Sequence, residues 1–186
     1  MATWRALIKD TDFCMNEIST SQRVQIELLH GQGAHVDPIA CVEDVSAELA
    51  SRSVEGFPHS IAGLVFHLNY WMNYELQRIR GERPKYPEHA AESWPAADAA
   101  LTADEWDRLR RDFAWFLAEY EKMARLSLQE LERQVESMRE GDKKHAGSVQ
   151  AVLWQMVAHN SYHAGQIAMI RRMLGAWPPR GGGDTW

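Results

Sequence analysis

The chain has 186 residues, of which 45% are hydrophobic and 25% are charged, and its formal net charge is −6. This composition is ordinary for a single globular domain, and the acidic balance argues against a general nucleic-acid binder, which would normally show a basic face. No apolar run approaches the roughly 18 residues of a membrane span, and residues 1–5 do not resemble a secretory signal. We therefore expect a cytoplasmic protein.

The first half of the chain predicts two main helices. The first covers about residues 20–30 and ends at Gly31 and Gly33, because glycine readily closes helices. After a short helical piece and a loop, the second helix is expected from about Ser60 to Arg80. Its apolar residues recur at the three- and four-residue spacing of a buried helix face. This apolar stripe consists of Ile61, Leu64, Leu68, Trp71, Met72 and Ile79.

Residues 81–103 form a long connection that is rich in proline. A connection of this length in a compact domain usually crosses the molecule or covers a site. The third helix is predicted to begin at Thr102, because Glu105 three residues later completes a capping box. It is expected to continue to about Arg139, shortly before Gly141.

The fourth helix is predicted over about residues 148–174 and closes at Gly175, which leaves 176–186 as a tail. No internal repeat and no strand-like alternation accompany these segments. Four amphipathic helices, with a short connection between the last two and a long one between the middle two, predict an all-α fold. We expect a four-helix bundle that forms a single domain over 1–186, with its core at about 20–175.

Two histidines of the fourth helix, His159 and His163, are four residues apart and so lie on the same helix face. Together with Asn160 they fall within one sector of about 100° that otherwise carries apolar residues. Polar groups on such a face are costly unless hydrogen bonds or a metal satisfy them. His67, at the edge of the stripe on the second helix, is by spacing alone as consistent with a core histidine as with a ligand. Three neutral imidazoles would form a catalytic type of divalent-metal site with open positions.

The spacing of His159 and His163 also suits a metalloprotease, but that chemistry needs a glutamate directly after the first histidine, where this chain has Asn160. We interpret Asn160 and Gln166 as groups that orient the imidazoles or a ligand, or equally as polar residues satisfied within the bundle. His35 is the alternative fourth ligand. We otherwise expect His35, like His30, His59, His89 and His145, at the solvated surface.

Two further features concern cysteine and tryptophan. Cys14 and Cys41 lack CxxC spacing and are interpreted as ordinary thiols in a reducing compartment. Trp94 lies in a loop-like stretch, where a large aromatic residue more often lines a cleft or a partner surface.

The run HNSYHAGQI at 159–167 resembles the C-terminal helix signature of the DinB/YfiT-like superfamily of metal-binding four-helix bundles. The run PHSIAGLVFHL at 58–68 resembles the second-helix motif of that superfamily, whose histidine is the remaining ligand. The likeness spans roughly 20–175. It implies an up-down-down-up bundle that often dimerises, with His67, His159 and His163 holding nickel or zinc, and with iron as the alternative metal.

Characterised relatives in this superfamily include thiol-dependent transferases and isomerases. The resemblance therefore implies a metal-dependent transferase that joins a low-molecular-weight thiol to a small electrophile, with no protein nucleophile. Trp71 is a further pocket candidate beside Asn160 and Gln166. The alternatives are a metal-dependent hydrolase and a non-catalytic metal-binding or stress-response module. A homodimer is expected, with Trp115 and its neighbours Phe116 and Tyr120 on the third helix as a dimer surface or, in the alternative, as core.

Overall fold

The chain is mostly helical in the structure, as the sequence predicts. The structure is a computed structural model and describes residues 18–95, 100–138 and 147–183. None of the helices in these ranges is long and apolar enough to cross a membrane. The elements are α1 (Thr20–Leu29), α2 (Ala40–Glu43), α3 (Ala47–Ser51), α4 (Ile61–Ile79), the 3₁₀ helix η1 (Ala90–Ser93), α5 (Ala103–Ala124), α6 (Leu128–Leu131), β1 (Gln134–Val135), β2 (Gly147–Ser148) and α7 (Val149–Met173).

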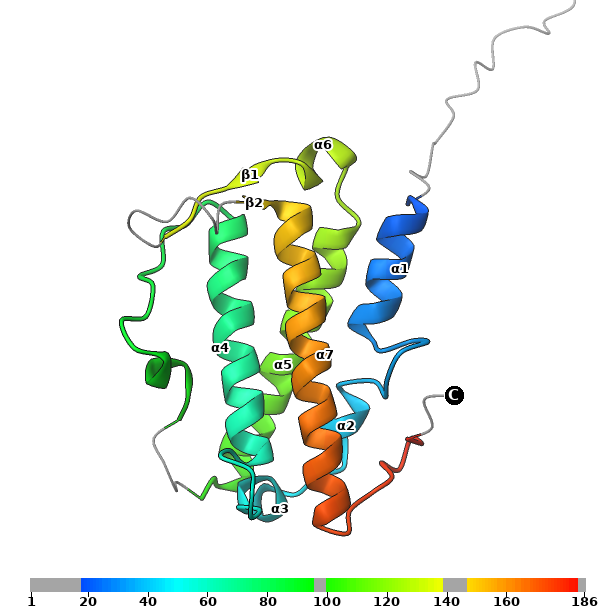
Figure 1. The fold of residues 1–186 in the computed structure, drawn as a ribbon, viewed down its shortest axis with the longest axis vertical. Coiled ribbons are helices and arrows are strands. Elements are labelled where there is room, and N and C mark those ends of the chain that lie inside the picture. The colour runs from blue at the N-terminus through cyan, green and yellow to red at the C-terminus, as the bar shows by residue number, and fades with distance from the viewer. Residues whose placement is uncertain (1–17, 96–99, 139–146, 184–186) are drawn as a thin grey trace, which may run out of the picture.

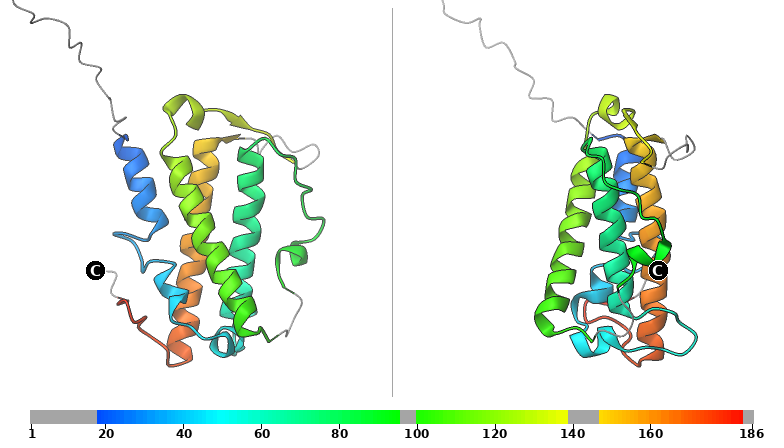
Figure 2. Two further views of the ribbon diagram at one scale, coloured as in Figure 1. Left: turned by 180° about the vertical axis from the view of Figure 1, so that it is seen from behind. Right: turned by 90° about the vertical axis from the view of Figure 1, so that its left-hand side faces the viewer.

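The helices α1, α4, α5 and α7 lie side by side along the long axis of the molecule (Figure 1 and Figure 2). In these views α4 and α5 run in one direction, while α1 and α7 run in the other. Because α5 starts at the same end as α4, the connection between them has to return along α4. Figure 1 shows this connection, with η1 in it, passing down the outer side of α4. The parallel direction of α4 and α5 thus explains why the connection is long.

Hydroxyl caps start the long helices where the sequence places them. The Ser60 hydroxyl accepts a hydrogen bond from the third backbone N–H of α4 at 3.2 Å, and Thr102 forms the predicted capping box with Glu105 at the start of α5. Between the helices lies a continuous apolar core. Within it, the fully buried Tyr120 of α5 donates its hydroxyl to the Met72 carbonyl of α4 at 2.8 Å, which ties the two parallel helices together.

The third helix is shorter than predicted. It ends at Ala124, so the expected continuous helix to Arg139 is wrong. Ser127 starts a separate turn, α6, in which the Ser127 hydroxyl accepts from the Glu130 N–H at 3.3 Å and the Glu130 carboxylate accepts from the Ser127 N–H at 3.1 Å. Such a capping serine offers the backbone a partner that competes with helix continuation. Gly141, the expected helix end, lies outside the described residues.

A small sheet follows α6, although the sequence shows no strand-like alternation. The strands β1 and β2 pair antiparallel, with Gln134 opposite Ser148 and Val135 opposite Gly147. Two residues per strand are too few to produce a period-two pattern that a sequence could show. The pairing brings the chain directly into the start of α7.

The aromatic residues proposed as a dimer surface on the third helix lie largely in the core. Phe116 and Tyr120 are buried, whereas Trp115 is 48% exposed. The Arg80 guanidinium lies over the Trp115 ring at 5.9 Å from its centroid. Core packing is therefore the correct interpretation for Phe116 and Tyr120.

An arginine anchors the tail that the sequence leaves without a role. Arg171 is 2% exposed and donates to Asp44 at 2.8 Å, to the Cys41 carbonyl at 2.8 Å and to the Ala176 carbonyl at 2.9 Å. Asp44 also accepts a hydrogen bond from the Arg180 N–H at 2.8 Å. The first part of the tail is thus held against the segment after α2.

His30, which ends α1, lies between two carboxylates. Its Nδ1 is 3.6 Å from Asp37 Oδ2, and its Nε2 is 3.5 Å from Glu121 Oε2 on α5. The close Asp37 carboxylate raises the pKa of His30, and the charge of Glu121 adds to this effect, while burial opposes it. The cluster joins α1, the loop after it and α5 most strongly when His30 is protonated.

Candidate metal centre

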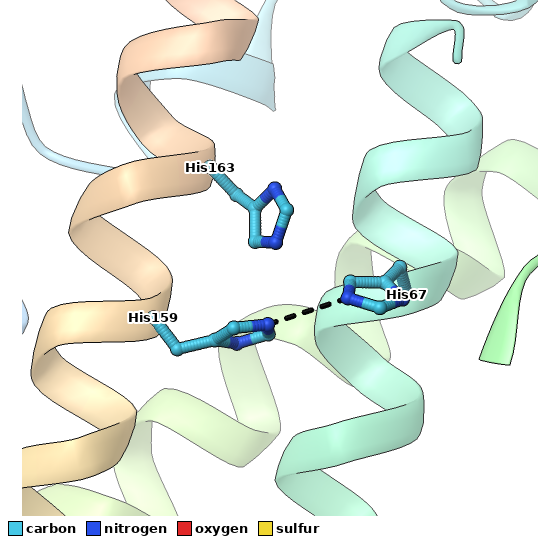
Figure 3. A group of neighbouring side chains, drawn as sticks. All are labelled: His67, His159 and His163. Atoms are coloured by element: carbon cyan, nitrogen blue, oxygen red, sulfur yellow. Dashed lines mark hydrogen bonds between the residues drawn. The ribbon is translucent and has the colours of Figure 1, made fainter. Parts of the chain in front are cut away.

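Three histidines from two neighbouring helices meet at one place. His67 lies on α4, and His159 and His163 lie one turn apart on α7. The ligand nitrogens of the three residues all lie within 4.8 Å of one another, and Figure 3 shows the rings grouped between the two helices. The Nε2 atoms of His67 and His159 are 3.3 Å apart. The structure thus brings together all three histidines that the sequence singles out.

Hydrogen bonds to Nδ1 set the tautomers of two of these rings. His67 Nδ1 is 3.1 Å from the Ser93 carbonyl oxygen, and His163 Nδ1 is 2.6 Å from Gln166 Oε1. Both partners are oxygen acceptors, so Nδ1 carries the proton and Nε2 keeps its lone pair. His159 Nδ1 is buried and has no hydrogen-bond partner within the described residues. The site therefore offers imidazole lone pairs in a confined space.

Burial keeps the three rings neutral. It lowers the pKa of His67 to about 4, the neighbouring His163 adds to this effect, and the Ser93 carbonyl opposes it. Burial likewise lowers the pKa of His159 to about 4, again with a contribution from His163. Burial also lowers the pKa of His163, while the hydrogen bond to Gln166 opposes it. At neutral pH the rings are thus in the form that binds divalent metals.

The connection after α4 supplies two residues that the sequence analysis did not assign to the site. Ser93, at the end of η1, provides the carbonyl that accepts from His67. The Trp94 ring stacks on the His67 ring at a centroid distance of 3.8 Å, and on the His59 ring at 3.5 Å. His59 is therefore half-buried against tryptophan instead of solvated. A tryptophan in a loop-like stretch was the one sequence signal for this arrangement.

Gln166 and Asn160, the two residues expected to orient the imidazoles or a ligand, differ in what they contact. Gln166 contacts His163 directly and donates its amide to the Tyr162 hydroxyl at 3.3 Å. Asn160 instead directs its amide nitrogen to the Met72 sulfur at 3.4 Å. It is buried beside the site, and its side chain partly offsets the lowered pKa of the adjacent histidine.

His35, the alternative fourth ligand, is not part of the cluster. Its Nε2 lies 2.8 Å from the Ser161 hydroxyl, and its Nδ1 lies 2.8 Å from the Val36 carbonyl oxygen. Both ring nitrogens are thus engaged elsewhere.

A cavity of ≈190 Å³ lies beside the histidines, and His159 forms part of its wall. Trp71 also lines it, with its ring inclined to the His67 ring at a centroid distance of 6.3 Å. A small molecule in this cavity would lie next to the nitrogen cluster.

The donor set fits a divalent metal ion. The Nε2 atoms of His67 and His159 face each other at 3.3 Å, and each of the three neutral rings offers one lone pair. A cation between the rings would engage such lone pairs, and the oxygen acceptors on Nδ1 of His67 and His163 would orient the rings and increase their basicity. Three neutral ligands would leave an ion its full charge and would leave room for further ligands.

Comparison with protein families gives one match. The family model of mycothiol-S-transferase covers residues 27–176, which is most of the chain and includes all three histidines. Neither the curated proteins nor the solved structures contain a match. The match confirms the resemblance to the DinB/YfiT-like superfamily, to which this family belongs. The chain is therefore a member of the mycothiol S-transferase family of the DinB/YfiT-like metal-binding superfamily.

Proposed function

We propose that the protein is a metal-dependent transferase that joins a low-molecular-weight thiol, mycothiol or a close relative, to a small electrophile. The observation that carries this proposal is the convergence of His67, His159 and His163 in a chain of the mycothiol S-transferase family. Nickel or zinc is the expected metal, with iron as the alternative, because imidazole sites accept several of these ions.

A divalent ion at this site would supply the positive charge that favours a thiolate over a thiol. The thiolate sulfur provides the electron pair of the new S–C bond, the leaving group departs with the pair of the broken bond, and the thiol proton goes to solvent. The protein positions the reactants and supplies no nucleophile. Ser93 and Trp94 fix the His67 ring, and Gln166 fixes the His163 ring.

The test is the consumption of p-nitrobenzyl chloride with and without added mycothiol. We expect chloride release and a thioether product only with the thiol and with metal-reloaded protein. A His159→Ala/His163→Ala variant that stays folded by circular dichroism should lose this reaction. Thiol-independent chloride release would support the hydrolase instead, and no turnover with metal bound would support a non-catalytic module.

We further propose that residues 1–186 form one domain with its core at about 20–175, a four-helix bundle of up-down-down-up order. The directions of α1, α4, α5 and α7 support this order. A cytoplasmic location and a homodimer remain predictions, and light scattering of the purified protein tests the dimer by its mass.

A further inference from the structure

The cavity beside His159 has aromatic walls. Trp71 and Tyr74 come from α4, and Tyr86 comes from the connection after it. The ring centroids are 5.5 Å apart for Trp71 and Tyr74, 6.1 Å for Trp71 and Tyr86, and 6.0 Å for Tyr74 and Tyr86. The ring planes are inclined at 78°, 52° and 82°. The three rings thus lie against one another and together form an aromatic part of the cavity wall.

The charges among the described residues of the cavity wall offset each other. Glu75 and Arg78 form a buried ion pair at 2.5 Å, with side chains that are 4% and 5% exposed. Burial raises the pKa of Tyr74 to about 12, although Arg78 opposes this, so the phenol stays uncharged. This part of the wall therefore favours an uncharged ligand, because the described residues offer a charged ligand no free countercharge to offset its desolvation.

The volume limits the size of that ligand. At ≈190 Å³, the cavity is smaller than the roughly 300–1,000 Å³ of pockets for drug-sized molecules. A six-membered ring with a small substituent fits such a space. A complete thiol that carries a sugar or a peptide is larger than this space, so much of the thiol would extend beyond the cavity.

We propose that this cavity is the electrophile subsite and that it takes an uncharged compound with a single aromatic ring. The inference rests on the proposed thiol transfer, in which the electrophile has to lie beside the histidine cluster. Aromatic walls favour an aromatic ligand through stacked and edge-to-face contacts, and the thioethers of Met138 and Met156 in the wall add sulfur–ring contacts. The ring is unchanged in the reaction, since the S–C bond forms and the leaving group departs at the carbon of its substituent, at the His159 side.

The experiment measures binding of an unreactive probe, 4-fluorobenzyl alcohol, to metal-free protein by fluorine NMR. Trp71→Leu and, separately, Tyr86→Leu should each weaken binding roughly five- to tenfold, because each removes one aromatic wall. Tyr86 lies on the connection and is 37% exposed, so its replacement leaves the core intact. The matched control is Trp115→Leu, the same change at an exposed tryptophan of α5 outside this cavity, which should bind as the wild type does.

Competition with three further compounds measures which ligands the cavity prefers. Cyclohexylmethanol and 4-fluorobenzoate should compete at least fivefold more weakly than benzyl alcohol, which would show the preference for an uncharged aromatic ring. Methyl glucoside should not displace the probe. The proposal would be overturned if methyl glucoside displaced the probe, if both wall variants bound the probe as tightly as the wild type, or if the wild type did not bind it. The binding experiment uses metal-free protein, so its outcome does not depend on metal binding. Metal content and thiol dependence therefore test the proposed function separately.

Discussion

Replacing Gln166 tests whether the hydrogen-bond partners of the histidines increase the metal affinity of the site. Gln166 Oε1 is 2.6 Å from His163 Nδ1, and Gln166→Leu would leave the buried N–H of His163 without its acceptor. Loss of such an orienting partner typically costs roughly 10- to 100-fold in metal affinity, which corresponds to about 1.4–2.7 kcal/mol. The unpaired N–H should also lower the free energy of unfolding of the metal-free protein by about 1–3 kcal/mol, because His163 is buried, so the metal affinity is measured on variants shown to be folded.

The assay is competition with a chromophoric chelator for zinc and, separately, nickel at neutral pH. Gln166→Glu keeps an oxygen acceptor and should retain the wild-type affinity or exceed it. The matched control is Gln129→Leu on α6, where the glutamine is exposed and is not part of the histidine group. An affinity of Gln166→Leu within about twofold of the wild type, or an equal loss in Gln166→Glu, would refute this reasoning.

Three other predictions concern the fold. Tyr120→Phe should lower the free energy of unfolding by about 1–2 kcal/mol in urea titrations, because the buried Met72 carbonyl loses its donor; an unchanged midpoint would contradict this. The folded-state pKa of His30 is raised, so its stabilisation is complete below the unfolded pKa and is lost as pH rises through the folded one. His30→Gln should therefore cost more stability at about pH 5.5 than at about pH 9, and an equal cost at both would refute the pairing. Burial raises the pKa of Cys41 to about 12, so in a Cys14→Ser background a thiol reagent should label the protein only after unfolding, whereas rapid labelling of the native state would show an accessible thiol.

The sequence predicts the two site histidines on α7 well, because the side chains of a helix follow a fixed period. Once His159 and His163 fall on an apolar face four residues apart, their shared direction follows from helix geometry alone. His67 needed the family resemblance, since its spacing alone is equally consistent with a core residue. The Gln166 contact was also foreseeable, because residues three apart on a helix are neighbours.

Ser93 and Trp94 could not be predicted as partners of His67 in the same way. They lie on a connection whose path along α4 is set by tertiary packing, and no local pattern specifies which part of it reaches the histidine. The end of α5 at Ala124 was missed for a different reason. Ser127 and Glu130 carry the same capping signal as Thr102 and Glu105, but helix-compatible residues on both sides favoured a continuous helix.

The most direct test of the central claim is the metal content of the purified protein, measured by inductively coupled plasma mass spectrometry. The wild type should carry about one divalent ion per chain, and His159→Ala/His163→Ala, shown to be folded by circular dichroism, should carry none. A wild-type protein that binds no metal even after incubation with zinc or nickel would contradict the account, and the three histidines would then be structural.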